Sequence, residues 1–280
     1  MDREFVFTQV DFERIRGLIR DRVGISLSEK KRDLVYSRIA RRLRALELKQ
    51  FSEYLDYLQS NDHEIQDFIN ALTTNLTSFF RESHHFNHLA KQMLERSHSK
   101  PVFRIWSSAC STGEEAYSIA MTAIETFGSW TPPVSILATD VDTNVLAQAK
   151  AGIYGFERVE KLSNDRLKHF FFKGKGPRDG SVRIRPEVQA LIQFKPFNLL
   201  AEQWPVKGPL DAVFCRNVMI YFDKPTQYEI LTRFHPLLRD RGLLYAGHSE
   251  SFQHAADLFK SQGQTIFKPV IHPGRLGGRS

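Results

Sequence analysis

The stretch VFRIWSSACSTGEEAYSIA, residues 102–120, decides the fold. It begins with a short β-rich run, continues through a turn of small residues, and ends in a helical pattern whose first turn contains Glu114 and Glu115. Strand, tight turn and helix form the unit by which doubly wound sheets bind nucleotide cofactors. Of the glycine triad that a dinucleotide site requires, this stretch retains Gly113. It therefore predicts a cofactor site of a different kind.

The two acids indicate the charge of that cofactor. A dinucleotide brings a pyrophosphate of about two negative charges to the helix N-terminus, where two carboxylates would repel it. S-adenosylmethionine carries a sulfonium and an ammonium group against one carboxylate, so its net charge is positive. The small residues at 107–112 would let the backbone approach it closely. The alternative is that Glu114 and Glu115 only complement the helix dipole.

Alternating strand and helix patterns continue outward from this stretch. Short β-rich runs lie at residues 102–107, 134–139, 191–198, 210–215 and 242–249. Helical patterns lie at residues 114–127, 143–154 and 226–238. The alternation predicts an α/β fold with a doubly wound, Rossmann-like sheet, which a late run at 264–270 would close antiparallel.

The rest of the chain suggests further units. Residues 1–73 carry apolar residues at helical spacing and predict a small all-helical domain. Residues 74–101 are expected to be a linker that contributes to the cofactor site, and residues 102–270 the cofactor-binding domain. A Gly/Pro turn at about 170–187 predicts an inserted β-hairpin. The Gly/Arg-rich tail, residues 271–280, is expected to be disordered.

The charge of the chain, +7 with an isoelectric point near 9.4, raises the possibility of a nucleic-acid partner. Over residues 1–73, however, basic and acidic residues are equal in number, and the bases concentrate between residues 30 and 49. On a helical wheel, Lys31, Arg38, Arg42 and Lys49 fall on one stripe beside an apolar face. The stripe predicts a surface for an acidic partner; the alternative is an ordinary solvated face.

Location and metal content can also be predicted. No apolar run approaches the ~18 residues of a membrane helix, and the acidic start does not resemble a signal peptide, so we expect a cytoplasmic protein without membrane insertion. Cys110 and Cys215 are expected to be buried free thiols. His84 and His88 have metal-ligand spacing on a helix, but without a supporting motif we predict helix packing and no metal.

Polar residues cluster where the cofactor cleft is expected. Asp140 ends the second strand, where a carboxylate accepts hydrogen bonds from ribose hydroxyls, while Asp142 is placed to cap the next helix. The segment NLTSFFRE, residues 75–82, and the segment FCRNVMIYFD, residues 214–223, add further polar groups beside the sheet.

These segments resemble those of a known family, the chemotaxis receptor glutamate methyltransferases called CheR. The matching stretches are NLTSFFRE, WSSACSTGEEAYSIA, ATDVDTNVLAQAKAGIY, NLL, FCRNVMIYFDK and GLLYAGHSE, and with the helical domain and the insertion they cover nearly the whole chain. The resemblance implies methyl transfer from S-adenosylmethionine to glutamate side chains on the cytoplasmic helices of chemoreceptors, which yields methyl esters and S-adenosylhomocysteine.

The resemblance also implies roles for individual residues. Arg81 and Tyr221 would lie nearest the transfer. The expected cofactor contacts are Asn75, Thr77, Arg81, Glu115, Asp140, Asn198, Leu199, Arg216 and Asn217. The basic stripe, Lys31, Arg38, Arg42 and Lys49, would face the substrate. Because a glutamate carboxylate is ionised at pH 7, the reaction needs alignment and exclusion of water but no general base.

Some members of the family hold the receptor's C-terminal peptide on the inserted subdomain. Here Gly174, Gly176 and Arg183 match that kind, and the edge near Val182 and Ile184 is expected to accept an acidic-aromatic strand. The alternative is a hairpin that merely covers the sheet. We expect a monomer that does not bind nucleic acid. The rival hypotheses are a nucleic-acid methyltransferase and a non-catalytic S-adenosylmethionine-binding adaptor.

Overall fold

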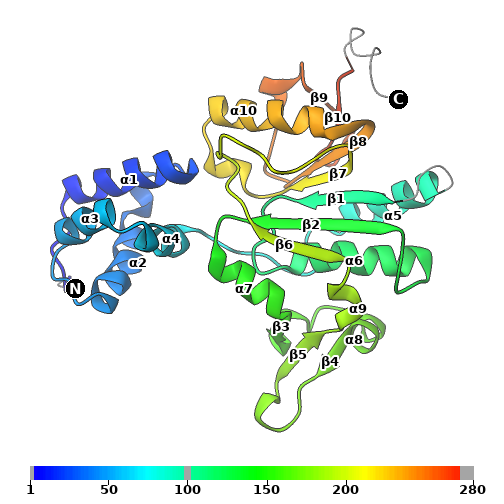
Figure 1. Ribbon diagram of the computed structural model, residues 1–280, viewed down its shortest axis with the longest axis horizontal. Helices are drawn as coiled ribbons and strands as arrows, with labels where there is room; N and C mark the ends of the chain where they lie inside the picture. Colours follow the sequence, from blue (N-terminus) through cyan, green and yellow to red (C-terminus); the bar gives the residue numbers. More distant parts are fainter. Residues whose placement is uncertain (1–2, 98–101, 272–280) are drawn as a thin grey trace.

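A computed structural model of the chain describes residues 3–97 and 102–271 (Figure 1). The tail expected to be disordered lies outside the described residues, apart from Ile271. No helix of the described residues is long and apolar enough to cross a membrane.

Residues 3–72 form the helical domain that the sequence predicts. Its helices are α1 (Gln9–Val23), α2 (Arg32–Ala45), α3 (Phe51–Ser60) and α4 (Asp62–Leu72), with a short 3-10 helix, η1 (Glu29–Lys31), before α2. Thr8 and Asp11 form a capping box that starts α1. Phe12, Val35 and Phe68 belong to a buried core within this domain. The domain lies to one side of the sheet (Figure 1).

The second domain is built on a seven-stranded sheet with the order β6-β2-β1-β7-β8-β10-β9. Its strands are β1 (Phe103–Ser107), β2 (Val134–Asp140), β6 (Ile192–Pro196), β7 (Leu210–Cys215), β8 (Leu238–Ala246), β9 (Phe259–Ser261) and β10 (Ile266–Pro269). The first five named are parallel, and β10 pairs antiparallel with β8, as the sequence predicts. The chain reverses its winding between β1 and β7, where such sheets bind ligands at their carboxyl ends.

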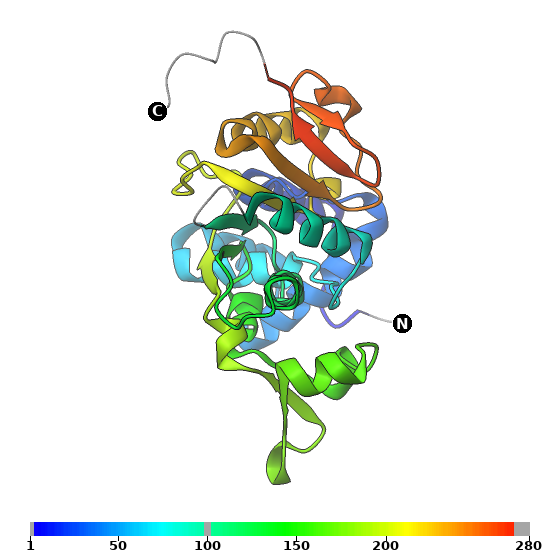
Figure 2. The same cartoon turned by 90° about the vertical axis from the view of Figure 1, so that its right-hand side faces the viewer.

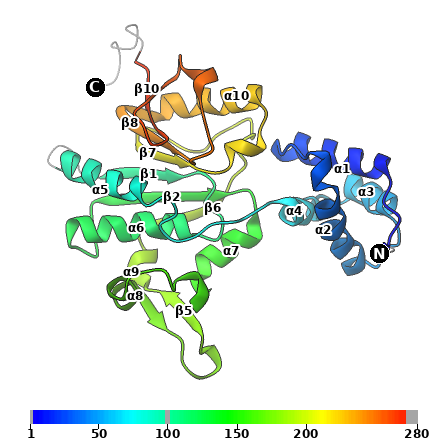
Figure 3. The same cartoon turned by 180° about the vertical axis from the view of Figure 1, so that it is seen from behind.

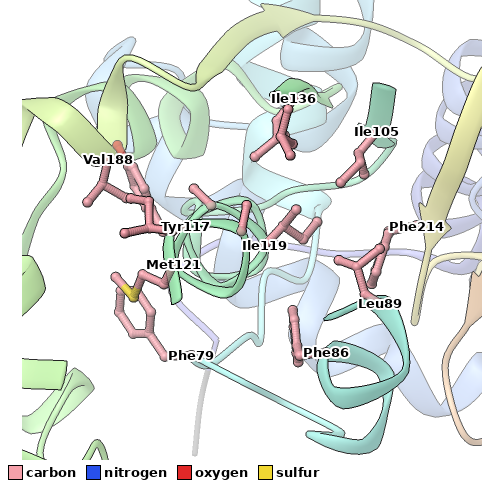
Figure 4. Packing of buried hydrophobic residues seen from close by; sticks show 14 of the residues in the cluster. Phe79, Phe86, Leu89, Ile105, Tyr117, Ile119, Met121, Ile136, Val188 and Phe214 are labelled. Atoms are coloured by element: carbon pink, nitrogen blue, oxygen red, sulfur yellow. The ribbon is translucent and has the colours of Figure 1, made fainter. Parts of the chain in front are cut away.

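Helices cover both faces of the sheet. Along β7, Ala212 and Phe214 face one core, whereas Val213 and Cys215 face the other, so the whole strand is buried. The helices α5 (His84–Ser97) and α6 (Glu114–Phe127) pack on the first face, and α10 (Lys224–Phe234) packs on the second. Figure 4 shows α6 between Ile105 and Ile136 of the sheet and the rings of Phe79 and Phe86.

The insertion is larger than the predicted hairpin. Helix α7 (Thr143–Ala151) ends at Gly152, which has φ +61°, so the expected helix at 143–154 is too long. A three-stranded sheet with the order β3-β5-β4 follows, and it extends away from the main sheet (Figure 2). It consists of β3 (Ile153–Gly155), β4 (Phe171–Lys173) and β5 (Ser181–Ile184), with α8 (Asn164–Phe170) and α9 (Pro186–Gln189).

The prediction of an exposed edge near Val182 and Ile184 is wrong. Both residues lie on β5, the central strand, which pairs with β3 on one side and β4 on the other. Both side chains are buried. The free edges of the subdomain belong instead to β3 and β4.

An extended segment, residues 73–83, connects the two domains and runs along the sheet domain (Figure 3). Direct hydrogen bonds reinforce this connection. Ser26 donates its backbone N–H to the carbonyl of Tyr221 at 2.9 Å, and the Asn198 amide donates to the carbonyl of Arg22 at 2.8 Å. The helical domain is therefore held against the carboxyl ends of the strands.

Candidate cofactor and active site

A cleft of about 1190 Å³, counting its open mouth, lies between the helical domain and the carboxyl ends of β1, β2 and β7. Each expected cofactor contact lines it, as do Tyr221 and Lys31: the cofactor set is Asn75, Thr77, Arg81, Glu115, Asp140, Asn198, Leu199, Arg216 and Asn217. Sequence reasoning did not anticipate the apolar wall that the helical domain supplies, which includes Val23, Ile25 and Leu27. The cleft thus combines an apolar wall with a few converging polar groups.

The loop after β1 forms the floor of the cleft. Ser111, with φ +49°, donates its backbone N–H to Asp140 Oδ2 at 2.8 Å. Gly113 adopts φ +97°, and a Cβ at this position would lie 2.9 Å from the Cβ of Ala149. The single glycine of the loop is therefore required for close packing against α7 and for its left-handed backbone.

Glu114 and Glu115 have different surroundings although they are neighbours. Glu115 lines the cleft, accepts a hydrogen bond from Ser107 Oγ at 2.7 Å and pairs with Arg216 at 3.0 Å. Burial raises the pKa of this carboxyl, and the nearby Arg216 opposes that shift. Glu114 is fully buried outside the cleft lining, where it pairs with Arg158 and accepts from Thr112 Oγ1 at 2.6 Å. Only Glu115 is available to a cationic ligand.

Asp140 and Asp142, two residues apart, have different surroundings. Asp142 accepts from the backbone N–H groups of Asn144 and Val145 and caps α7, which confirms the predicted cap. Asp140 lines the cleft and is 8% exposed. Burial raises its pKa to about 6, although its oxygens accept two backbone N–H groups.

Polar contacts shape the segment 75–82 and join it to the sheet domain. Within the segment, Arg81 donates to the carbonyl of Leu76 at 2.9 Å. The Asn75 amide donates to Asp142, in the sheet domain, at 2.7 Å. The guanidinium of Arg216 lies 3.3 Å from Glu82 and also donates to the carbonyl of Arg81. Arg216 therefore joins this segment to Glu115 across the cleft.

The loop after β7 carries Arg216, Asn217 and Tyr221, the last within the 3-10 helix η4 (Met219–Tyr221). Arg216 is almost completely buried, and Asn217 adopts φ +58°. Glu250, beyond the end of β8, accepts the backbone N–H groups of this loop. Glu250 lies in the stretch GLLYAGHSE, where no local sequence pattern indicates this contact with the loop after β7.

Asn198 and Leu199 border the cleft from the chain after β6. The amide of Asn198 is engaged by its own surroundings, because its Oδ1 accepts from Leu200 N at 2.9 Å and its Nδ2 donates to Arg22. Leu199 is buried. In this structure Asn198 thus helps to join the two domains.

The predicted basic stripe is not continuous. Helix α2 ends at Ala45, so Lys49 lies outside it. Arg42 forms ion pairs with Glu64 at 2.6 Å and Asp67 at 2.9 Å, and these carboxylates compensate its charge. Arg38 donates to the carbonyls of residues 71 and 73, which leaves Lys31, on η1, at the cleft. The prediction of one continuous basic stripe along a single helix is therefore wrong.

The residues expected to hold a peptide are spread over the inserted subdomain. Gly174 and Gly176 lie in the turn between β4 and β5, where Gly176 has φ +59°. Arg183 lies on β5, opposite Ile153 of β3 and Phe172 of β4. These two apolar side chains are 41% and 45% exposed, so Arg183 lies in the middle of a partly apolar surface.

The subdomain also contacts the cofactor loop, which no local sequence signal indicated. Arg158, on the 3-10 helix η2 (Phe156–Arg158), reaches Glu114 and the carbonyl of Thr77. Tyr154 donates its hydroxyl to the carbonyl of Thr112 at 2.6 Å. These contacts depend on residues far apart in the chain.

Among the described residues, Glu82, His84 and His85 bring potential metal ligands within 4.8 Å of one another. The Arg216 guanidinium beside Glu82 would repel a cation there. Burial and the charge of Arg216 lower the pKa of His85 to about 4. The ring of His88 contacts the Tyr245 hydroxyl at 3.0 Å instead of sharing a site with His84, as expected for packing.

A doubly wound sheet whose cleft presents two buried carboxylates, Glu115 and Asp140, suits a cationic nucleoside cofactor and defines the class: S-adenosylmethionine-dependent methyltransferases. Residues 75–268 match the model of the CheR methyltransferase SAM-binding domain, and residues 10–73 match that of the CheR methyltransferase all-alpha domain. The chain belongs to the CheR family of methyltransferases and is an S-adenosylmethionine-dependent enzyme of chemotaxis.

Individual relatives agree with this assignment. The chain is 51% identical to chemotaxis protein methyltransferase 2 of Pseudomonas aeruginosa, with 96% of each chain covered. It is also 51% identical to the chemotaxis protein methyltransferase of Escherichia coli, with 95% of this chain and 93% of that one covered. Its identity to the chemotaxis protein methyltransferase of Klebsiella aerogenes is 49%, with 95% and 92% covered.

Proposed function

We propose that the chain transfers a methyl group from S-adenosylmethionine to glutamate side chains on the cytoplasmic helices of chemoreceptors. The products are glutamate methyl esters and S-adenosylhomocysteine. One observation carries the proposal: a single cleft brings Glu115 and Asp140 together with Arg81, Tyr221 and the helical domain. The names of the relatives support a role in chemotaxis.

The cleft residues fit a cationic nucleoside. Asp140 would accept hydrogen bonds from the ribose hydroxyls, and Glu115 would face the ammonium group. Asn75, Thr77 and Asn217 would complete the polar contacts, while Leu199 and the wall from the helical domain would cover the apolar part. When bound, S-adenosylmethionine supplies an electrophilic methyl group.

The residues of the chain contribute alignment and dehydration. Arg81 would orient the substrate carboxylate, and Tyr221 would fix its approach from the opposite loop. Since that carboxylate is already ionised at neutral pH, no side chain has to remove a proton. Holding two reactants in line contributes up to about 7–11 kcal/mol. The apolar wall of the helical domain would exclude water during this step.

Substrate recognition involves two further surfaces. Lys31, at the cleft, would attract the acidic receptor helices over about 8–10 Å in physiological salt, with Arg38, Arg42 and Lys49 as an outer and largely compensated contribution. On the inserted subdomain, Gly174 and Gly176 would shape the turn beside a bound acidic-aromatic peptide from the receptor C-terminus. That peptide would pair with the free edge of β3 or β4 while Arg183 contacts its acid.

We further propose a cytoplasmic monomer that uses neither a metal nor a nucleic acid. Labelled S-adenosylmethionine, incubated with receptor cytoplasmic fragments or with RNA, tests the function as a whole. Label in protein carboxyl groups supports the proposal. Label in RNA would indicate the rival nucleic-acid methyltransferase, and label in neither would indicate a binding adaptor.

Titration with receptor C-terminal peptides tests the tether. Micromolar binding that is lost in Arg183→Glu supports it, and Lys168→Glu, exposed on α8 of the same subdomain, is the charge-matched comparison. No binding by any receptor tail, together with unchanged methylation after tail deletion, would leave the subdomain a structural role.

A further inference from the structure

Glu250 is a buried carboxylate that the proposed reaction does not use. It is 6% exposed and lies four residues beyond Ala246, the end of β8. Its Oε1 accepts the backbone N–H of Val218 at 3.0 Å and of Met219 at 2.8 Å. Its Oε2 accepts the backbone N–H of Asn217 at 3.0 Å and of Gly247 at 2.5 Å. One carboxylate thus satisfies four backbone donors.

Three of these donors are consecutive residues, 217–219. Successive backbone N–H groups that converge in this way form a concave site for an anion. Here the anion is a side chain of the same protein, so the site is filled internally. The carboxylate of Glu250 therefore determines the shape of the loop.

The loop has a conformation that needs support. Asn217 adopts φ +58°, a left-handed conformation that is uncommon outside glycine, although asparagine adopts it more readily than most residues. A Cβ on Gly247 would lie 2.2 Å from Asn217 Nδ2, so the Asn217 amide rests directly on the backbone of residue 247. Glu250 binds the N–H groups of both residues and holds this contact together.

The same loop lines the cleft with Arg216, Asn217, Val218, Tyr221 and Phe222. We propose that Glu250 is a positioning residue, whose carboxylate fixes the loop 217–219 and thereby directs Asn217 toward the cofactor and Tyr221 toward the transfer. This assignment rests on the proposed function for the role of Tyr221. The part of the proposal that concerns Asn217 depends only on cofactor binding.

Glu250→Gln is the direct test, because the variant keeps the size of the side chain and replaces one accepting oxygen by an NH₂ group. Two backbone donors then lose their acceptor, which corresponds to a roughly 5- to 100-fold increase in the Kd for S-adenosylmethionine. We expect weaker binding of S-adenosylmethionine by calorimetry and lower kcat with receptor fragments, both at a temperature where circular dichroism shows the variant folded. Asp211→Asn is the matched control, since Asp211 is a buried carboxylate elsewhere in the sheet.

A double-mutant cycle separates positioning from stability. If Glu250 acts through Asn217, then Asn217→Ala and Asn217→Ala/Glu250→Gln will bind S-adenosylmethionine with the same Kd within about twofold. If the two substitutions instead raise the Kd independently, so that their effects multiply in the double variant, that part of the proposal is overturned. Wild-type Kd and kcat in folded Glu250→Gln would overturn it entirely.

Glu250→Asp serves if Glu250→Gln does not fold. This variant retains both oxygens but withdraws them by one methylene, so we expect reduced kcat at a melting temperature no lower than that of Asp211→Asn. Kinetics equal to those of the control variant would contradict the proposal. If the wild-type enzyme methylates no receptor fragment, the proposed function fails, while the calorimetric cycle still tests Glu250.

Discussion

At the scale of single residues, the adjacent acids Glu114 and Glu115 show how one helix start can perform two tasks. Glu115 faces the cleft, where Arg216 and Ser107 hold it. Glu114 faces the inserted subdomain and pairs with Arg158. The sequence did not distinguish the two acids, whereas the structure places Glu115, and not Glu114, among the residues that line the cleft.

Asp140 provides the residue-scale prediction for the cofactor. Asp140→Ala should weaken S-adenosylmethionine binding by about 1–3 kcal/mol, because the ribose hydroxyls lose their acceptor while the fold stays intact. Since burial raises the pKa of Asp140 to about 6, the wild-type affinity should be highest above pH 6 and fall as the pH decreases through that value. Calorimetry between pH 5 and 8 checks both statements. Equal affinity of both proteins at pH 7.5 would remove Asp140 from the site.

Arg81 and Tyr221 provide the residue-scale prediction for catalysis. Arg81→Ala should lower turnover far more than melting temperature, since this side chain is 30% exposed in the cleft and contributes little to the core. Tyr221→Phe should behave in the same way if its hydroxyl orients the reacting groups. Steady-state kinetics and thermal unfolding measure the two effects. Normal turnover in both variants would contradict the assignment.

At the scale of elements, the inserted subdomain is connected to the cofactor loop. Arg158→Gln removes the partner of the buried Glu114 and a donor to the carbonyl of Thr77. We expect a loss of about 2 kcal/mol in unfolding free energy and weaker cofactor binding, because an unpaired buried carboxylate is unfavourable. Denaturant unfolding measures the first effect. Glu114→Gln/Arg158→Gln should recover part of the stability, and a double variant no more stable than the single one would argue against the pair.

The basic stripe yields a second prediction for an element. Lys31→Glu, at the cleft, should raise the KM for receptor fragments and flatten its salt dependence, while affinity for the cationic cofactor should not fall. Arg42→Glu should mainly destabilise the helical domain, because its partners Glu64 and Asp67 would face a third carboxylate. If Lys31→Glu methylates receptors normally at low salt, this surface does not guide the substrate.

Elements differ in how well the sequence predicts them. Strand β7 is predictable because its continuous apolar run is buried on both faces. Strand β3 has three residues and directly follows a helix, so its identity comes from pairing with β5. The positions of Arg158 and Glu250 depend on contacts between distant segments. Local patterns therefore predicted Glu115 and Asp140, and the family resemblance predicted the other cleft residues, but neither predicted Arg158 and Glu250, which hold them.

At the scale of the whole molecule, the cleft needs both domains. The sheet domain contributes the carboxylates and the loop with Tyr221, and the helical domain contributes an apolar wall and Lys31. Hydrogen bonds from Ser26 and Asn198 join the two. We propose that this joint cleft methylates glutamates on receptor helices.

The most direct measurement follows the methyl group of labelled S-adenosylmethionine. The protein is incubated with receptor cytoplasmic fragments, with the same fragments carrying glutamine in place of the methylated glutamates, and with RNA. We predict label in the first fragments only, released as methanol by mild base as expected of an ester, and lost with Arg81→Ala. Base-stable label, label in RNA, or equal label in the glutamine-substituted fragments would contradict the account.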